Sequence, residues 1–409
     1  MKNDFDKLLE GLRNRFGPNP RIAIVCKGGP ENGPFSAMAA WIITLVLAQY
    51  GYEVSAIYAC SGSVSTGLLG CIGEFKKLCV LWANVTSQDI VGRPQKRNLL
   101  FRSKVIYRIF SRISFFSSRY LRKLIKDNWD LDRICSDKSL LTKFPAVDAL
   151  SSEYVIFSNK NPKHKEWFEE GALGSKALIP FLEPQIVLDP EKADLIEEGK
   201  ARIIDGESRL MEPKSKPYKA ALLIDGGYGG NMLLEEAQRD GFNVVFLVDI
   251  HGLVPTKTDL KMKRHWSSLI RIGQHLLSNT NDVRQFRATE RVNEEIEVKE
   301  TEEKVVRELK TLMVNMPIEY AVKLEPIIKQ IEENIDTMNN GRLRLGDKTK
   351  TQPYMVSNKE HSTLFNFSNF EQQEVLDLLN WGREAAINTL QELGFDTSDV
   401  PPLSELLTS

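Results

Sequence analysis

The sequence has 409 residues, of which 42% are hydrophobic and 27% charged, so the chain can build one large packed domain or two ordinary ones. The formal net charge of -1 gives no global argument for a nucleic-acid or an acidic partner. The five cysteines are scattered without a C-x-x-C pair, which indicates neither a disulfide framework nor a zinc knuckle and favours a reducing compartment. The sequence also lacks a signal-peptide pattern and an apolar run of about eighteen residues, so we expect no secretory leader and no membrane span.

The first predicted elements are a helix, a strand and a second helix. Residues 1–20 are expected to form a helical N-terminal extension, in which the amphipathic stretch Met1–Phe16 ends at a Gly-Pro pair. Arg21–Cys26 reads RIAIVC and predicts a short buried strand. The strand runs into the glycine-rich stretch KGGPENGP, and Phe35–Gln49 then predicts a strongly apolar helix.

A glycine-rich loop between a strand and a helix is suited to hold an anion. Glycines let backbone N–H groups approach a negative oxygen, and the helix N-terminus adds partial positive charge. Three interpretations fit: the phosphate loop of a nucleotide-binding α/β protein, an oxyanion loop for acyl transfer, and a turn without a ligand. The phosphate-loop spellings G-x-x-x-x-G-K-[ST] and G-x-G-x-x-G are absent, which disfavours the first.

A serine follows the second predicted strand, Val54–Ala59, and a helix-like pattern follows the serine. The turn reads ACSGS around Ser61. A strand that stops at a serine among very small residues and turns directly into a helix outlines a nucleophile elbow, usually spelled G-x-S-x-G. A tight turn without function is the simpler interpretation. A right-handed crossover between two parallel strands would place the glycine loop beside this serine, where a reacting carbonyl could meet both.

The segment Arg93–Lys126 combines many basic residues with apolar and aromatic ones and contains no acid. A basic amphipathic helix with aromatics fits an anionic membrane surface. A partly buried helix with a cationic solvent face fits the pattern equally well. RNA binding is a poorer third interpretation because no nucleic-acid motif accompanies the segment. We expect residues 93–130 to form a basic amphipathic insertion or lid.

The middle of the chain predicts three more strands and one helix made of small residues. The strands are Glu153–Ser158, Ala220–Ile224 and Asn243–Ile250, and the helix lies in Gly171–Pro184 and ends at a proline turn. The stretch Glu191–Lys219 is polar and charged, which indicates a surface excursion.

An acid stands at the end of one of these strands, where it could face a site. Asp225 follows Ala220–Ile224 and precedes Gly226 and Gly227, although a D-G pair also makes simple turns. Of the five histidines, His251 is the best placed for a Ser-His-Asp triad, and an ordinary loop role is the simpler interpretation. No histidine pair has metal-ligand spacing.

The C-terminal third reads as mainly helical. Arg284–Asn340 is charge-rich with a break at Pro317, and its alternating acids and bases suit a solvated helix with i,i+4 pairs. Gly341–Pro353 is polar and loop-like. Phe370–Leu393 predicts an amphipathic helix that could dock on the core.

Taken in order, these segments resemble the patatin-like phospholipase family. The segment AALLIDGGYGGNMLLEEAQRDGFNVVFLVDI looks like the family's strand, D-G-[GA] turn, E-E-A helix and following buried strand. GALGSKALIPFLEP looks like its small-residue helix with an isoleucine-proline turn. The glycine loop has the spacing of the family's G-G-G-x-[RK]-G oxyanion motif, and the serine elbow lies at the family's distance after Gly51. The similarity covers Arg21–Ile250, and Phe365–Ala386 more weakly.

The resemblance implies a three-layer α/β/α fold with a mostly parallel central sheet and additional helices at the C-terminal end. It implies a catalytic domain at residues 21–280 and a helical region at 281–409 that packs on the core. It also implies a serine-aspartate dyad without histidine, metal or cofactor. By position, the nucleophile is Ser61, the base is Asp225, the oxyanion hole contains Gly28, Gly29 and Gly62, and the supporting turns contain Gly33, Gly226 and Gly227.

The sequence departs from the family pattern at three places. Ala and Ser replace both glycines of the elbow. Pro30 takes the third glycine of the oxyanion motif and has no N–H to donate. Asn32 stands where the family has Arg or Lys, and its amide could still donate a hydrogen bond. Ser65, in SVSTG, is an alternative nucleophile that keeps a glycine two residues later; Ser61 is preferred because it keeps the spacing from Gly51.

Two functions from different classes follow. The first is a lipid acyl hydrolase of the phospholipase A or esterase type, a serine hydrolase that cleaves a carboxylic ester of a phospholipid or other lipid. The second is a catalytically weak protein that binds lipid or a partner at membranes, which Pro30 and Asn32 favour. We expect a cytoplasmic location with peripheral membrane contact through Arg93–Lys126, and no nucleic-acid partner.

Overall fold

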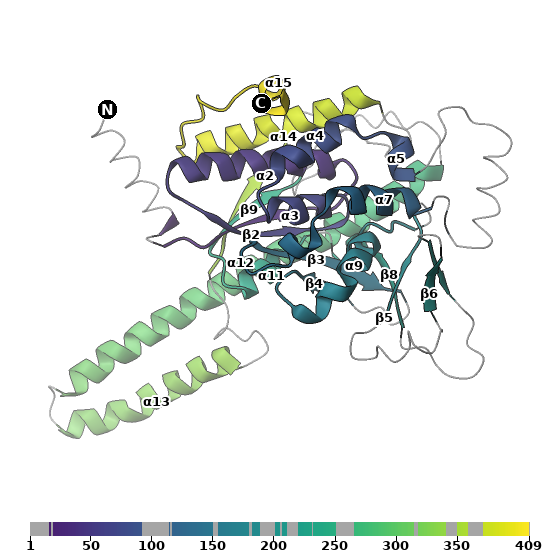
Figure 1. The fold of residues 1–409 in the computed structure, drawn as a ribbon. Helices are drawn as coiled ribbons and strands as arrows, with labels where there is room; N and C mark the ends of the chain where they lie inside the picture. Colours follow the sequence, from purple (N-terminus) through teal and green to yellow (C-terminus); the bar gives the residue numbers. More distant parts are fainter. Residues whose placement is uncertain are drawn as a thin grey trace, which may run out of the picture.

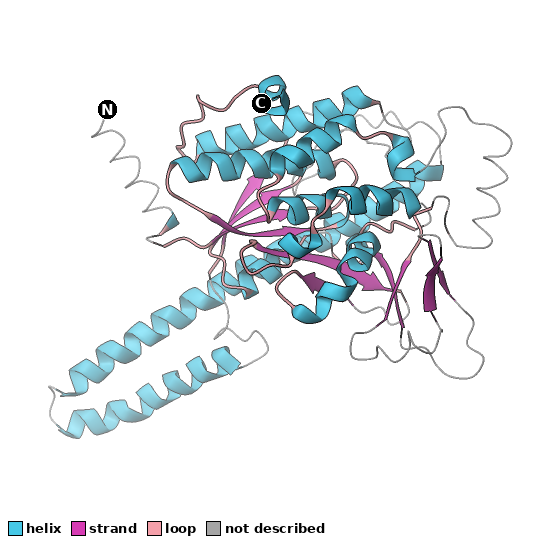
Figure 2. Cartoon of the chain, in the orientation of Figure 1, coloured by secondary structure: helices cyan, strands magenta, loops and turns pink. Residues whose placement is uncertain are grey.

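A computed structural model describes residues 16–17, 19–91, 114, 117–149, 154–179, 182–188, 201–204, 207–210, 220–230, 232–250, 266–314, 318–340, 350–358 and 371–408. Helices surround a central sheet in this structure (Figures 1 and 2). Several sequence predictions fall outside the described residues. They are the N-terminal helix up to residue 15, the helix break at Pro317 and the candidate triad residue His251, together with most of the basic segment Arg93–Lys126, of the surface excursion Glu191–Lys219 and of the loop Gly341–Pro353.

The central sheet has eight strands in the order β10-β9-β1-β2-β3-β8-β5, and β4 pairs with β3 outside this path. Pairing is parallel from β10 through β9, β1 and β2 to β3, and antiparallel for β4, β8 and β5. The strands are β1 (Ile22–Cys26), β2 (Val54–Ala59), β3 (Leu141–Asp148), β4 (Tyr154–Ser158), β5 (Gln185–Leu188), β8 (Ala220–Asp225), β9 (Val244–Val248) and β10 (Gln352–Val356). A separate two-stranded sheet consists of β6 (Ala201–Ile204) and β7 (Glu207–Leu210).

The alternation of side chains along the buried strands builds a core on each face of the sheet. In β1, Ile22 and Ile24 point to one core and Ala23 and Val25 to the other. The first core is covered by α2 (Asn32–Gln49), α4 (Phe75–Asn84) and α14 (Gln372–Glu392), and the second by α11 (Leu234–Arg239). Figure 1 shows α14 lying along α2. The expected three-layer α/β fold with a mostly parallel sheet is therefore confirmed.

The remaining helical elements lie around this framework. They are η1 (Ser61–Ser63), α3 (Val64–Gly70), α5 (Ser87–Val91), α7 (Arg119–Asn128), α8 (Leu131–Ile134), η2 (Pro162–Trp167), α9 (Phe168–Ser175), η4 (Gly226–Tyr228), α12 (Trp266–Val314), α13 (Ile318–Asn340) and α15 (Leu403–Thr408). The helices α12 and α13 form a hairpin that projects from the sheet-containing body (Figure 1), and Val306, Ile328 and Ile335 pack between them. None of the helices in the described part of the chain has the length and hydropathy needed to cross a bilayer.

The five predicted strands are confirmed as β1, β2, β4, β8 and β9, the predicted apolar helix as α2 and the predicted amphipathic helix as α14. Two boundaries were wrong. Gln352 and Pro353 were expected in a loop but begin β10, an edge strand in which a proline costs little because one side of the strand forms no ladder. The helix expected within Gly171–Pro184 ends at Ser175, and the next residues, Lys176 and Ala177, turn to contact Gly62 and Asp225.

The predicted basic segment is described at residues 114 and 117–126. Within it, the prediction that the basic residues face an anionic surface is wrong for Arg122, which is 4% exposed. The guanidinium of Arg122 donates to Glu169 at 2.6 Å, Glu170 at 2.9 Å and Gln185 at 2.9 Å. Two carboxylates therefore draw Arg122 inward, and α7 packs against the body through this residue.

Candidate active site

Ser61 lies at the sharp turn between β2 and the short helix η1. Its φ of +49° is in the left-handed region, and among the described non-glycine residues no other has a positive φ. A side chain at such a φ is strained, and the surrounding structure must hold it there. The strain arises because the buried strand β2 turns into a helix within one residue, which projects the serine hydroxyl out of the turn.

The side chain of Asp225, at the end of β8, lies against this serine. Ser61 Oγ donates to Asp225 Oδ2 at 2.5 Å, and the second carboxylate oxygen accepts the N–H of Gly227 at 2.8 Å. The backbone N–H of Asp225 donates to the carbonyl of Ala177 at 3.1 Å. The predicted nucleophile and the predicted base, 164 residues apart in sequence, are thus in direct contact.

Burial makes this carboxylate more basic than an exposed one. Asp225 is 2% exposed, and desolvation raises its pKa to about 6, against the opposing effects of the Ser61 hydroxyl, the Gly227 N–H and the charge of Lys176. A carboxylate with this pKa is a better proton acceptor at neutral pH than an ordinary aspartate. The pair can therefore transfer a proton from the serine while Ser61 attacks an electrophile.

The glycine loop and the serine turn touch through their backbones. A Cβ built on Gly62 would lie 2.1 Å from the carbonyl oxygen of Gly29, so a side chain there would push the two segments apart. A Cβ built on Gly33 would lie 2.6 Å from the indole ring of Trp82. The predicted oxyanion residues Gly29 and Gly62 are therefore neighbours, and Gly28 lies in the same loop.

Asn32 holds the glycine loop in place rather than pointing at the serine. Its Nδ2 donates to the carbonyl of Gly28 at 2.9 Å and lies 3.5 Å from Asp249 Oδ1, while its Oδ1 accepts the N–H of Ile250 at 2.9 Å. Lys27 and Asp249 form a buried ion pair at 3.0 Å. The possibility that the Asn32 amide donates to a reacting oxygen is therefore not supported, because both of its N–H groups have acceptors.

The serine at position 63, which replaces an elbow glycine, joins the elbow to the loop. Ser63 Oγ lies 2.7 Å from the carbonyl of Lys27 and 3.1 Å from that of Asn32, and it accepts from Ser36 Oγ at 3.0 Å. Ser63 is fully buried. A small residue with a hydroxyl fits this position because it fills the tight turn and also pairs with two buried carbonyls.

The remaining predicted residues are placed as follows. A Cβ on Gly226 would lie 2.4 Å from the carbonyl oxygen of Pro145, so the turn after Asp225 packs directly on β3. The alternative nucleophile Ser65 lies on α3, where its hydroxyl accepts from Lys176 Nζ at 3.1 Å. The structure thus pairs Asp225 with Ser61 and pairs Ser65 with a lysine.

A mostly apolar cavity of about 70 Å³ opens beside Ser61. It is lined by Pro30, Ser61, Gly62, Trp82, Ile90, Leu121, Lys176, Leu178 and Leu182. Leu121 belongs to α7, so the described end of the basic segment borders this cavity. Apolar walls next to a nucleophile suit an acyl chain whose ester carbonyl reaches the serine.

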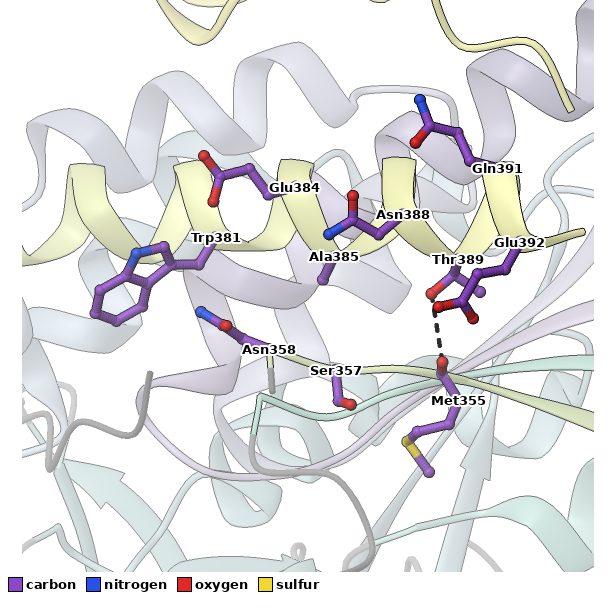
Figure 3. Close-up of a pocket in the computed structure, with 10 residues that line it drawn as sticks. All are labelled: Met355, Ser357, Asn358, Trp381, Glu384, Ala385, Asn388, Thr389, Gln391 and Glu392. Carbon is purple, nitrogen blue, oxygen red and sulfur yellow. Dashed lines mark hydrogen bonds between the residues drawn. The ribbon is translucent and has the colours of Figure 1, made fainter. Parts of the chain in front are cut away.

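A larger cavity of about 390 Å³ lies between the end of β10 and α14 and is drawn in Figure 3. Its lining includes Ser357 and Asn358, after β10, and residues of α14, among them Trp381, Glu384 and Asn388. This cavity shares no lining residue with the cavity at Ser61 and contains none of the predicted site residues. The larger of the two cavities is therefore separate from the serine turn.

Sequence reasoning missed several side chains that shape the site. Ser175 Oγ accepts the N–H of Ser61 at 3.4 Å, and Lys176 Nζ donates to the carbonyl of Gly62 at 3.3 Å. Both lie in the segment that resembled the family's small-residue helix. Its abundance of small residues indicated close packing, but nothing in the local pattern indicated which partner the segment packs against.

Comparisons with known proteins give a distant likeness. No family model matches the sequence, and no curated protein matches it. The chain is similar to the structure of human GIVD cytosolic phospholipase A2, with 12% identity over 60% of this chain and 46% of that chain and a TM-score of 0.30. It is also similar to VipD from Legionella pneumophila, with 8% identity over 92% of this chain and 67% of that chain and a TM-score of 0.35. The chain therefore spans less than half the length of the phospholipase A2 chain.

Proposed function

We propose that this protein is a serine hydrolase that cleaves carboxylic esters of lipids, with Ser61 as nucleophile and Asp225 as base. The observation that carries the proposal is the 2.5 Å hydrogen bond from Ser61 Oγ to a buried carboxylate, made by a serine in a strained turn at the edge of an apolar cavity. A structural serine needs neither the strain nor the basic partner.

The proposed reaction follows from the positions of these groups. Ser61 Oγ attacks the ester carbonyl while its proton moves to Asp225, and backbone amides of Gly28, Gly29 and Gly62 stabilise the negative oxygen. The tetrahedral intermediate then expels the alcohol, which takes the proton from Asp225 and leaves an acyl group on Ser61. A water molecule then gives a proton to Asp225 as it attacks the acyl-serine. The second tetrahedral intermediate releases the carboxylic acid, and the proton returns from Asp225 to Ser61 Oγ.

The substrate class follows from the cavity. Its apolar lining favours an acyl chain, and Leu121 connects it to the basic segment Arg93–Lys126, which we propose makes peripheral contact with an anionic membrane. Residues 21–280 would then form the main part of the catalytic domain. From residues 281–409, β10 and α14 complete its sheet and helical layer, while the α12–α13 hairpin projects from it. The lack of a backbone N–H at Pro30 favours the second candidate, a weakly active protein that binds lipid at membranes.

A fluorophosphonate probe, which modifies activated serines, tests the proposal. We expect the folded wild-type protein to be labelled on the peptide that contains Ser61, and we expect labelling to be lost in Ser61→Ala and Asp225→Asn. The matched control is Ser65→Ala, which lies one helical turn away and should keep its labelling. Loss of labelling in Ser65→Ala alone would transfer the role to Ser65. A folded wild type that resists the probe, with or without anionic vesicles, would rule out the hydrolase and favour the lipid-binding protein.

A further inference from the structure

Three consecutive residues at the end of α9 each contact a different part of the proposed dyad. Ser175 Oγ accepts the N–H of Ser61 at 3.4 Å. Lys176 Nζ donates to the carbonyl of Gly62 at 3.3 Å, and the carbonyl of Ala177 accepts the N–H of Asp225 at 3.1 Å. This segment therefore joins the serine turn to the end of β8, which carries the aspartate.

Lys176 is the charged member of this segment and lies in an unusual place for a lysine. It is 8% exposed and lines the cavity beside Ser61. Its ammonium group donates to two neutral oxygens, the carbonyl of Gly62 and the hydroxyl of Ser65 at 3.1 Å. Burying an ammonium group that contacts no carboxylate lowers the stability of the folded protein. An apolar side chain would fill the same space without this cost, so packing alone does not explain a lysine at position 176.

The charge acts on the groups that surround it. Among the described residues, the titratable groups that act electrostatically on the ammonium are the carboxylate of Asp225, at the end of β8, and the thiol of Cys60, just after β2. Burial lowers the pKa of Lys176 to about 8 in spite of both groups. In return, the ammonium lowers the pKa of Asp225, together with the hydrogen bonds from Ser61 and Gly227.

We propose that Lys176 is a positioning residue of the Ser61–Asp225 pair, an inference that rests on the proposed function. Its ammonium group fixes the backbone of Gly62, next to the nucleophile, and its charge keeps Asp225 in the ionised form that accepts the serine proton. The glycine loop has the neutral Asn32 where a basic residue would add charge, and a positive charge is thus supplied to the same cavity by Lys176, the residue after α9.

The proposal predicts a bell-shaped pH dependence for modification of Ser61. The rate should rise as Asp225 ionises near its pKa of about 6 and fall as Lys176 loses its proton near its pKa of about 8. A dyad that does not depend on the lysine would show the rise in rate near pH 6, the acidic limb, without the fall near pH 8, the alkaline limb. The measurement is the second-order rate constant for fluorophosphonate modification between about pH 5 and about pH 10, with hydrolysis of the probe measured in parallel.

Two variants separate charge from packing. Lys176→Met keeps the length of the side chain and removes both the charge and the hydrogen bond to Gly62. We expect a rate about tenfold lower at neutral pH, of which an acidic limb about one pH unit higher accounts for about twofold and the freed Gly62 backbone for the rest, and no alkaline limb. Lys176→Arg keeps the charge at every accessible pH, so its acidic limb should stay near that of the wild type while its alkaline limb disappears. Lys143→Met is the control, because Lys143 is also a largely buried lysine but pairs with Asp240 away from the cavity. Its profile should match the wild type.

Two results would overturn the inference. One is a wild-type profile without a limb near pH 8, which needs no variant to fold. The other is a uniform decrease in rate for Lys176→Met and Lys176→Arg with unchanged apparent pKa values, which would mean that the lysine only packs. Failure of the proposed function looks different, because wild-type Ser61 would then remain unmodified at every pH.

Discussion

The two segments that contact the serine turn, Ser61 and Gly62, use different chemistry. The glycine loop at residues 28–33 meets the serine turn through backbone atoms, at the contact between Gly29 and Gly62. The Ser175–Ala177 segment meets it through a hydroxyl, an ammonium group and a carbonyl. The first segment sets the shape of the site and the second sets its hydrogen bonds and charge, so changes in the two should have effects of different kinds.

The largest effect should come from disrupting the backbone contact between Gly29 and Gly62. In Gly62→Ala, the new Cβ meets the carbonyl of Gly29 and must displace the loop from the elbow. Because losing one oxyanion donor costs about a hundredfold or more in rate, we expect ester hydrolysis to fall by at least that factor. Steady-state kcat on a short-chain ester measures it. Ser65→Ala is the control, and equal activity of Gly62→Ala and wild type would refute the role of this contact.

Replacing the buried charge should raise stability while removing activity. The pKa of Asp225 is raised from 3.8 to about 6 on folding. Its contribution to the free energy of unfolding is therefore fully present below about pH 4, where the carboxyl is protonated, and is lost as the pH rises through about 6. Asp225→Asn avoids this loss, and at pH 7.5 we expect it to be more stable than wild type by about 1–3 kcal/mol. Urea denaturation at two pH values tests this, because the difference should vanish near pH 4. A wild type that is the more stable protein at pH 7.5 would contradict the argument.

A moderate effect should come from restoring the missing donor in the glycine loop. Pro30 lines the cavity and has no N–H, while its carbonyl accepts the N–H of Gly33 at 3.3 Å. Pro30→Gly adds a donor and keeps that carbonyl, so we expect up to about tenfold faster hydrolysis, with a loss of about 0.5–1 kcal/mol in stability. Parallel kcat and thermal unfolding measurements separate the two. An unchanged kcat would mean that this position faces no reacting oxygen.

The smallest effect should come from the neutral contact of the second segment. Ser175→Ala removes the acceptor of the Ser61 N–H, a partly buried bond of 3.4 Å to a fully buried hydroxyl. A hydrogen bond of this kind contributes about 1 kcal/mol, so we expect a decrease of about fivefold in kcat/KM and little change in the pH profile. A shifted profile would show that Ser175, as well as Lys176, controls the charge at the site.

The sequence predicted the backbone part of the site better than its side-chain part. Strand ends, glycines and the serine turn leave a local pattern, and that pattern, together with the resemblance to the patatin-like family, predicted that Ser61, Asp225, Gly29 and Gly62 belong to one site. The roles of Ser175, Lys176 and Asn32 depend on contacts with residues up to 218 positions away, which no local pattern encodes. The missed strand β3 has the same cause: its short alternating run LTKFPAVD carries a lysine and a proline, and pairing with β2 and β8 overrides its weak propensity.

Ser61 must carry the acyl group if the proposed mechanism is correct. The most direct measurement is mass spectrometry of the protein quenched with acid during turnover of an activated ester, followed by identification of the acylated peptide. We predict an acyl mass on Ser61 in the wild type, its absence in Ser61→Ala, and its retention in Ser65→Ala. An acyl group found on Ser65, or turnover by Ser61→Ala at the wild-type rate, would contradict the mechanism.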